Sequence, residues 1–181
     1  MDSDWVNVES GLLAVGALAQ GAHNAIVPYL PKLFNFFLQQ MQNPQRLVKS
    51  MPLWTASRFT DDIIQTEMFK PYLQSVMRCV MEPDHLVQVA ACTAFCVLVC
   101  RNPVELFEYL DEVLKIFSQA FEHYTGKALL NLLDAIASIA VVLGADLNQE
   151  DYVSSIFPRL LNLWNKTQDN DKLIWTLSET L

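Results

Sequence analysis

In this chain, the spacing of three cysteines is the pattern that most resembles a metal-binding or reactive site. Cys92, Cys96 and Cys100 follow one another at single-turn intervals, so they would share one face of a helix. Three thiolates on one face suit a soft metal ion, but a closed zinc site needs a fourth ligand, and the nearest candidate, His85, falls on a different part of the helix. Small buried packing residues explain the pattern better, and we expect neither a metal nor a disulfide.

The other titratable residues do not assemble into a catalytic arrangement. The carboxylate pair Asp61-Asp62 falls near a predicted helix end, where the helix dipole or solubility accounts for it. The histidines, also near predicted helix ends or turns, are His23, His85 and His123. The sequence contains no glycine-rich phosphate loop, HExxH, GxSxG or CxxC pair. We therefore expect that the protein is not an enzyme and binds no cofactor.

The elements that would position any site form a repeating unit of about 40 residues. Helices rich in small apolar residues begin near Trp5, Gln45, Asp84 and Lys127. Amphipathic helices, most of them flanked by proline, begin near Ile26, Met68, Pro103 and Glu150, and a further unit begins at Asp171. Such a period predicts an all-α fold, an α-α superhelix in which residues 1–181 form a single array of about four and a half helix pairs.

Composition narrows the classes of partner. Hydrophobic residues make up 52% of the chain and glycine occurs only 5 times, while strand-like alternation is scarce, so a sheet has little support. The net charge of −8 argues against direct binding of nucleic acid, because a phosphate backbone requires a basic surface. An acidic surface would suit a basic partner, although solubility alone accounts for it more simply.

The ends and apolar runs of the chain predict its environment. Polar residues interrupt every apolar run short of the roughly 20 residues that a spanning helix needs, so we expect no membrane insertion. The amino-terminal residues MDSDWVNVES lack the apolar core of a signal peptide, which favours the cytosolic side of any membrane. Because no terminal unit has a polar outer face, we expect a segment of a longer solenoid.

One face of the second helices forms a stripe across the repeats. Leu13, Trp54 and Thr93 occupy equivalent positions one repeat apart. The same face includes Met51 and Arg58 beside Trp54, and Asp134, Ser138 and Val141 in the next unit. One helix layer of a solenoid lines the concave side, where extended partners bind. Ordinary packing between repeats would also account for Leu13 and Trp54.

Proline complicates the helix that carries Trp54. Pro52 lacks a backbone N–H and disfavours a helix interior. The helix is therefore irregular at this point or begins near Met51, and either outcome would expose Trp54 more than a regular helix does.

Several runs of residues are more specific than the repeat itself. They are Glu9–Leu13, Gly16–Ala19, Ile26–Pro31, Trp54–Arg58, Val87–Phe95, Leu133–Ile136 and Pro158–Trp164. In this order they resemble the middle HEAT repeats of the transportin, or karyopherin-β2, family of nuclear import receptors within the importin-β superfamily. The match is collinear over nearly the whole chain, apart from a short deletion at residues 66–69.

The resemblance implies a HEAT-repeat solenoid that captures cargo proteins. Their nuclear localisation signals would be basic, extended segments ending in Pro-Tyr, held on the concave face. Release would follow when Ran loaded with GTP binds amino-terminal repeats of the full-length receptor, which this segment does not include. Nucleoporins would be further partners, and the receptor would shuttle between cytoplasm and nucleus through the nuclear pore. The alternative is a HEAT-repeat scaffold for the assembly of a protein complex, with Trp54 buried between repeats.

The resemblance also implies cargo-binding residues, which are Leu13, Met51, Trp54, Arg58, Asp134 and Ser138. Leu13 and Trp54 match positions of the Pro-Tyr pocket, and Met51 stands at another aliphatic position of the family. Arg58 would hold a peptide carbonyl or stack on the tyrosine ring. Asp134 matches a carboxylate that meets the basic part of the signal, and Ser138 replaces a similar hydroxyl.

The sequence departs from the family where the basic part of the signal would bind. The family carries glutamates where this chain reads Val99-Cys100-Arg101, and Val141 replaces another carboxylate. Fewer negative charges would face a basic peptide, so we expect binding to depend on the apolar pocket and Asp134. Its dependence on salt should be weaker than that of an acid-rich site.

Overall fold

The computed structural model describes residues 4–144, 150–167 and 173–180, and within these residues every regular element is a helix. The helices are α1 Asp4–Leu18, α2 His23–Ile26, the 3-10 helix η1 Val27–Tyr29, α3 Leu30–Gln40, α4 Arg46–Ser57, α5 Thr60–Ile64, α6 Phe69–Val80, α7 His85–Arg101, α8 Pro103–Phe107, α9 Leu110–Ala120, α10 Gly126–Leu143, α11 Glu150–Lys166 and α12 Leu173–Thr180.

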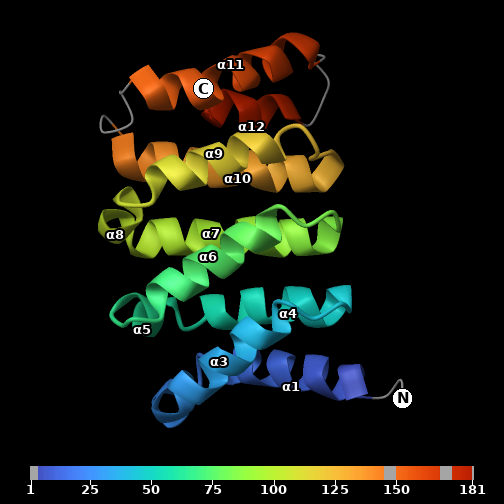
Figure 1. Cartoon of the computed structure of the whole chain (residues 1–181), viewed down its shortest axis with the longest axis vertical. Coiled ribbons are helices and arrows are strands. Elements are labelled where there is room, and N and C mark those ends of the chain that lie inside the picture. The colour runs from blue at the N-terminus through green and yellow to red at the C-terminus, as the bar shows by residue number, and fades with distance from the viewer. Residues whose placement is uncertain (1–3, 145–149, 168–172, 181) are drawn as a thin grey trace.

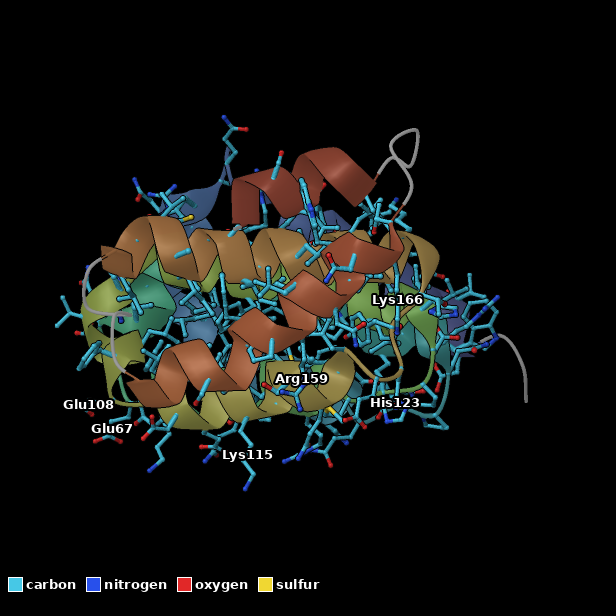
Figure 2. The ribbon with its side chains drawn as sticks, turned by 90° about the horizontal axis from the view of Figure 1, so that it is seen from above. Glu67, Glu108, Lys115, His123, Arg159 and Lys166 are labelled. Carbon is cyan, nitrogen blue, oxygen red and sulfur yellow. The ribbon has the colours of Figure 1, made fainter. Side chains whose placement is uncertain are left out.

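The long helices form two layers, which confirms the predicted all-α HEAT-repeat solenoid. One layer, here called the B layer, contains α1, α4, α7, α10 and α12, stacked in chain order (Figure 1). The other, here called the A layer, contains α3, α6, α9 and α11 in the same arrangement. The exposed side chains of Glu67, Glu108 and Lys115 project outward on the A-layer side (Figure 2). One surface of the B layer therefore remains open, because the A layer covers the opposite one.

The predicted helix starts agree closely with the structure. The B-layer helix predicted from Gln45 begins at Arg46, and the one predicted from Asp84 begins at His85, where the Asp84 carboxylate accepts a hydrogen bond from the Leu86 N–H at 2.9 Å. The short helices α2, η1, α5 and α8 were not separated from their neighbours in the sequence. They lie where the chain crosses from the B layer to the A layer.

Pro52 does not end its helix. α4 runs from Arg46 through Pro52 to Ser57, so the expectation that the helix begins near Met51 is wrong. The missing N–H removes one hydrogen bond of the helix, but α1 and α7 flank α4 in the B layer and the proline ring is buried. Tertiary packing therefore holds the helix together across the proline.

The core is continuous from Leu12 in the first helix to Leu177 in the last. Aromatic rings fill the space between the layers, and Phe95 of α7 meets Phe117 of α9 edge-to-face with ring centroids 4.9 Å apart. Because each repeat buries its apolar side only against its neighbours, this core fixes the position of one helix relative to the next.

α10 resembles a membrane-spanning helix in length and composition more than was predicted from the sequence. With 18 residues, it is long and apolar enough to cross a membrane by length and composition alone, and it is the one such helix among the described residues. In the fold, α10 lies between α7 and α12 in the B layer, and its buried residues belong to the common core. Core packing therefore accounts for its apolar composition.

Candidate functional site

The open surface of the B layer carries a shallow cavity of about 260 Å³, here called the apolar groove. It is lined by Leu13 of α1, by Ser50, Met51, Trp54 and Ser57 of α4, and by Leu86, Val89, Ala90, Thr93 and Ala94 of α7. The groove thus crosses three consecutive helices of the layer. Most of its lining side chains are apolar, so it suits an apolar part of a ligand.

Large apolar side chains remain accessible in this groove. Leu13 is 49% exposed and Trp54 is 36% exposed, while Met51 is half-buried between them and the core. The indole of Trp54 lies against Gly16 of α1, where an added Cβ would come within 2.9 Å of three ring carbons. The glycine therefore makes room for the ring beside the neighbouring helix.

The geometry of α4 explains why Trp54 faces the groove. Leu53 and Ala56 are fully buried in the core, which turns Met51, Trp54 and Ser57 towards the open surface.

Hydrogen bonding fixes the same orientation of α4. Thr55 is buried, and its hydroxyl lies 3.0 Å from both the Leu12 carbonyl of α1 and the Met51 carbonyl of α4, either of which can accept its proton. This close approach places Thr55 against α1, next to Trp54 in the chain.

A second cavity of about 640 Å³, here called the polar cavity, adjoins the groove at the carboxyl ends of α1, α4 and α7. Its charged and titratable lining residues are His23, Arg58, Asp61, Asp62, Cys96, Cys100 and Arg101. His23 Nε2 lies 2.9 Å from Asp62 Oδ2, and Arg101 Nη1 lies 3.3 Å from Asp61 Oδ2. Ser57 lines both cavities, so the two lie next to each other along α4.

The structure separates the predicted site residues into three places. Leu13, Met51 and Trp54 meet around the apolar groove, whereas Arg58 lies in the polar cavity. Asp134 and Ser138 are on α10, outside the lining of both cavities.

The two α10 residues differ in how far they reach solvent. Asp134 is exposed, whereas Ser138 is half-buried and donates its hydroxyl proton to the Asp134 backbone carbonyl at 2.8 Å. A ligand in the groove would therefore meet Asp134 only if it extended over α10.

The groove is also lined by Leu86, Val89 and Ala90 of α7, which are not among the site residues predicted from the sequence. Leu86 lies about two turns before Thr93, and Val89 and Ala90 lie about one turn before it. Thr93 belongs to the predicted stripe. The helical period itself would have identified them, because residues at these intervals share a face.

The cysteines follow a gradient along α7 instead of sharing one environment. Burial raises the pKa of the Cys92 thiol to about 12, and burial also raises the pKa of half-buried Cys96. The expectation of buried packing residues holds for Cys92 but is wrong for Cys100, which is exposed where α7 reaches the polar cavity. No group of metal-ligating side chains was found among the residues that the structure describes.

Comparison with known proteins gives a consistent set of relatives, although no family model matches the sequence. Transportin-1 of Mus musculus is 35% identical over 181 residues, covering 98% of this chain and 20% of the relative. Importin subunit beta-2 of Schizosaccharomyces pombe is 34% identical over 185 residues, with the same coverage of 98% and 20%. Transportin of Dictyostelium discoideum is 34% identical over 171 residues, covering 93% of this chain and 18% of the relative. The chain spans about a fifth of the length of these curated relatives.

Proposed function

Because this chain is a transportin-like segment of HEAT repeats, we propose that it forms part of a nuclear import receptor and binds basic Pro-Tyr nuclear localisation signals on the open face of its B layer. The proposed cargo-binding residues are Leu13, Met51, Trp54, Arg58, Asp134 and Ser138. The receptor would shuttle between cytoplasm and nucleus. Ran and nucleoporins would act through the full-length receptor.

The observation that carries this proposal is the apolar groove around Trp54. A proline ring and a tyrosine ring both gain free energy from an apolar, partly aromatic wall, and Leu13, Met51 and Trp54 supply one in a single cavity. Asp134, exposed on the next helix of the same layer, gives a basic residue of the ligand a carboxylate to meet. The net charge of −8 favours approach of a basic segment.

The exposure of Trp54 also separates this proposal from a purely structural scaffold. A pure scaffold could bury this side chain between repeats, whereas Trp54 is 36% exposed in an open groove. The accessible indole therefore favours a peptide receptor.

The test is fluorescence anisotropy of a labelled basic peptide ending in Pro-Tyr, titrated with the chain and with its Trp54→Ala variant. Trp54→Ala should weaken binding by roughly tenfold or more, because a central aromatic anchor contributes a large share of the binding energy. Trp164→Ala is a matched control, since Trp164 on α11 is 39% exposed and lies outside the groove.

Circular dichroism first establishes that the variants are as helical as the parent. Failure of a fully helical parent to bind the peptide would contradict the proposal. Equal affinities of Trp54→Ala and Trp164→Ala would place the peptide somewhere other than the groove.

A further inference from the structure

The charged side chains of the polar cavity differ in whether they have an interaction partner within the chain. Each aspartate has a partner within the chain, since Asp62 lies within hydrogen-bonding distance of the His23 ring and Asp61 pairs with Arg101. Arg58 lines the same cavity, is exposed, and has no ion-pair partner among the residues that the structure describes. Its guanidinium is therefore available to an anionic group from outside the chain.

Arg58 stands next to the apolar groove. It follows Trp54 by one turn on the same face of α4, and Ser57 between them lines both cavities. A ligand whose apolar side chain rests on Trp54 would place its next few atoms at Arg58. The ligand group that fits there is a carboxylate, because a guanidinium can bind both carboxylate oxygens at once.

The side chains around Arg58 favour an acidic ligand group over a basic one. Arg101 also lines the cavity and pairs with Asp61, whereas no ion pair joins Asp61 to Arg58 among the described residues. Asp62 is likewise engaged by His23, whose ring stacks on Phe59 with centroids 6.0 Å apart. A basic ligand residue would have to compete with His23 or Arg101 for one of these carboxylates, whereas a carboxylate can bind Arg58 without such an exchange.

We propose that the polar cavity is a carboxylate subsite, which binds an acidic group directly following the apolar anchor of a bound peptide. The proposal rests on the proposed function, and it defines the ligand further. The signals preferred by this chain would have basic residues before the Pro-Tyr element and an acid after it. That acid is either the terminal α-carboxylate of the peptide or the side chain of an added acidic residue.

Three labelled peptides test the subsite on the whole chain. They share one basic sequence ending in Pro-Tyr, and they carry a free terminal carboxylate, a terminal amide, or an added glutamate followed by an amide. The two acidic peptides should bind roughly tenfold tighter than the neutral one, as expected for a hydrogen-bonded ion pair. Tighter binding of only one acidic peptide would still support the subsite and would identify the source of the carboxylate.

Arg58→Gln should abolish the preference for the acidic peptides, so that all three peptides bind this variant with the same affinity. Arg78→Gln is the control, because Arg78 is exposed on α6 of the A layer and its loss changes the net charge equally. Circular dichroism verifies that both variants fold.

Two outcomes would overturn the carboxylate subsite while leaving the peptide groove intact. One is equal affinity for all three peptides, with binding still lost in Trp54→Ala. The other is a preference for acid that survives in Arg58→Gln. If no peptide binds to the folded chain, the proposed function fails and the subsite fails with it.

Discussion

Trp54 is held by a contact between two residues that lie far apart in the sequence. Its ring occupies the space left by the missing side chain of Gly16, while the rest of α4 is fixed by the core. A glycine inside a helix costs about 0.5–1 kcal/mol relative to alanine, so its presence at this point calls for a structural reason. Close approach of the indole provides one, and it couples α1 to the groove.

Gly16→Ala should therefore displace the indole of Trp54 and weaken peptide binding by roughly tenfold, because the new Cβ would overlap the ring. The stability should fall by about 1 kcal/mol or less, since the half-exposed ring can turn outward and alanine favours the helix. Anisotropy measures the affinity, and urea unfolding measures the stability.

Gly11→Ala is the matched control on the same helix. No atom lies within 4 Å of a Cβ added there, so this variant should bind as the parent does and unfold at slightly higher urea. If Gly16→Ala retained full affinity, the contact with Trp54 would not control the groove.

At the scale of helices, polar side chains connect one repeat to the next through backbone carbonyls. The last carbonyls of a helix lack partners within it. The hydroxyl of Tyr124 donates to the carbonyl of Val80, the last residue of α6, at 2.6 Å. The Cys79 thiol likewise points to the Met41 carbonyl after α3, with sulfur and oxygen 3.8 Å apart. These contacts set the register between neighbouring units.

Removing the Tyr124 hydroxyl tests this role. Burial raises the pKa of Tyr124 above its ordinary range, so the group stays protonated and donates. Tyr124→Phe leaves the buried end of α6 unsatisfied and should lower the free energy of unfolding by about 1–3 kcal/mol. Urea denaturation followed by circular dichroism gives the value.

Tyr29→Phe provides the comparison, because Tyr29 is exposed and its change should stay within about 0.5 kcal/mol. Equal stability of the two variants would mean that the hydroxyl of Tyr124 contributes nothing to the register between repeats.

Helices were predictable from the sequence because local signals define them. Asp84 caps α7, Pro103 begins α8, and the apolar period marks each face that is buried. The stripe of Leu13, Met51 and Trp54 followed from the same period. The contact of Trp54 with Gly16 did not, since it depends on how closely two helices pack.

The division of the surface into two cavities was also beyond the sequence. Arg58 shares a face with Trp54, yet it lies in the polar cavity because α2, α5 and the end of α7 meet there. Periodicity places side chains on a face but does not predict which distant helix ends surround them.

Across the whole molecule, negative charge is distributed broadly while the candidate site has little of it. The net charge of −8 attracts a basic peptide from a distance. Within the site, Asp134 is exposed on α10, and the aspartates of the polar cavity lie beside His23 and Arg101. Long-range attraction and contact binding therefore arise from different charges.

This separation predicts how salt affects binding of a basic Pro-Tyr peptide. Exposed charges farther apart than about 10 Å are largely screened at moderate ionic strength, so added salt should slow association by removing the broad attraction. Dissociation should change little, because apolar contact with Leu13 and Trp54 holds the bound peptide. We expect the dissociation constant to rise less than about threefold between low and physiological salt. Stopped-flow mixing measures both rates, and Asp134→Asn should reduce the remaining salt effect on dissociation. A steep loss of affinity driven by faster dissociation would show instead that charge contacts dominate the site.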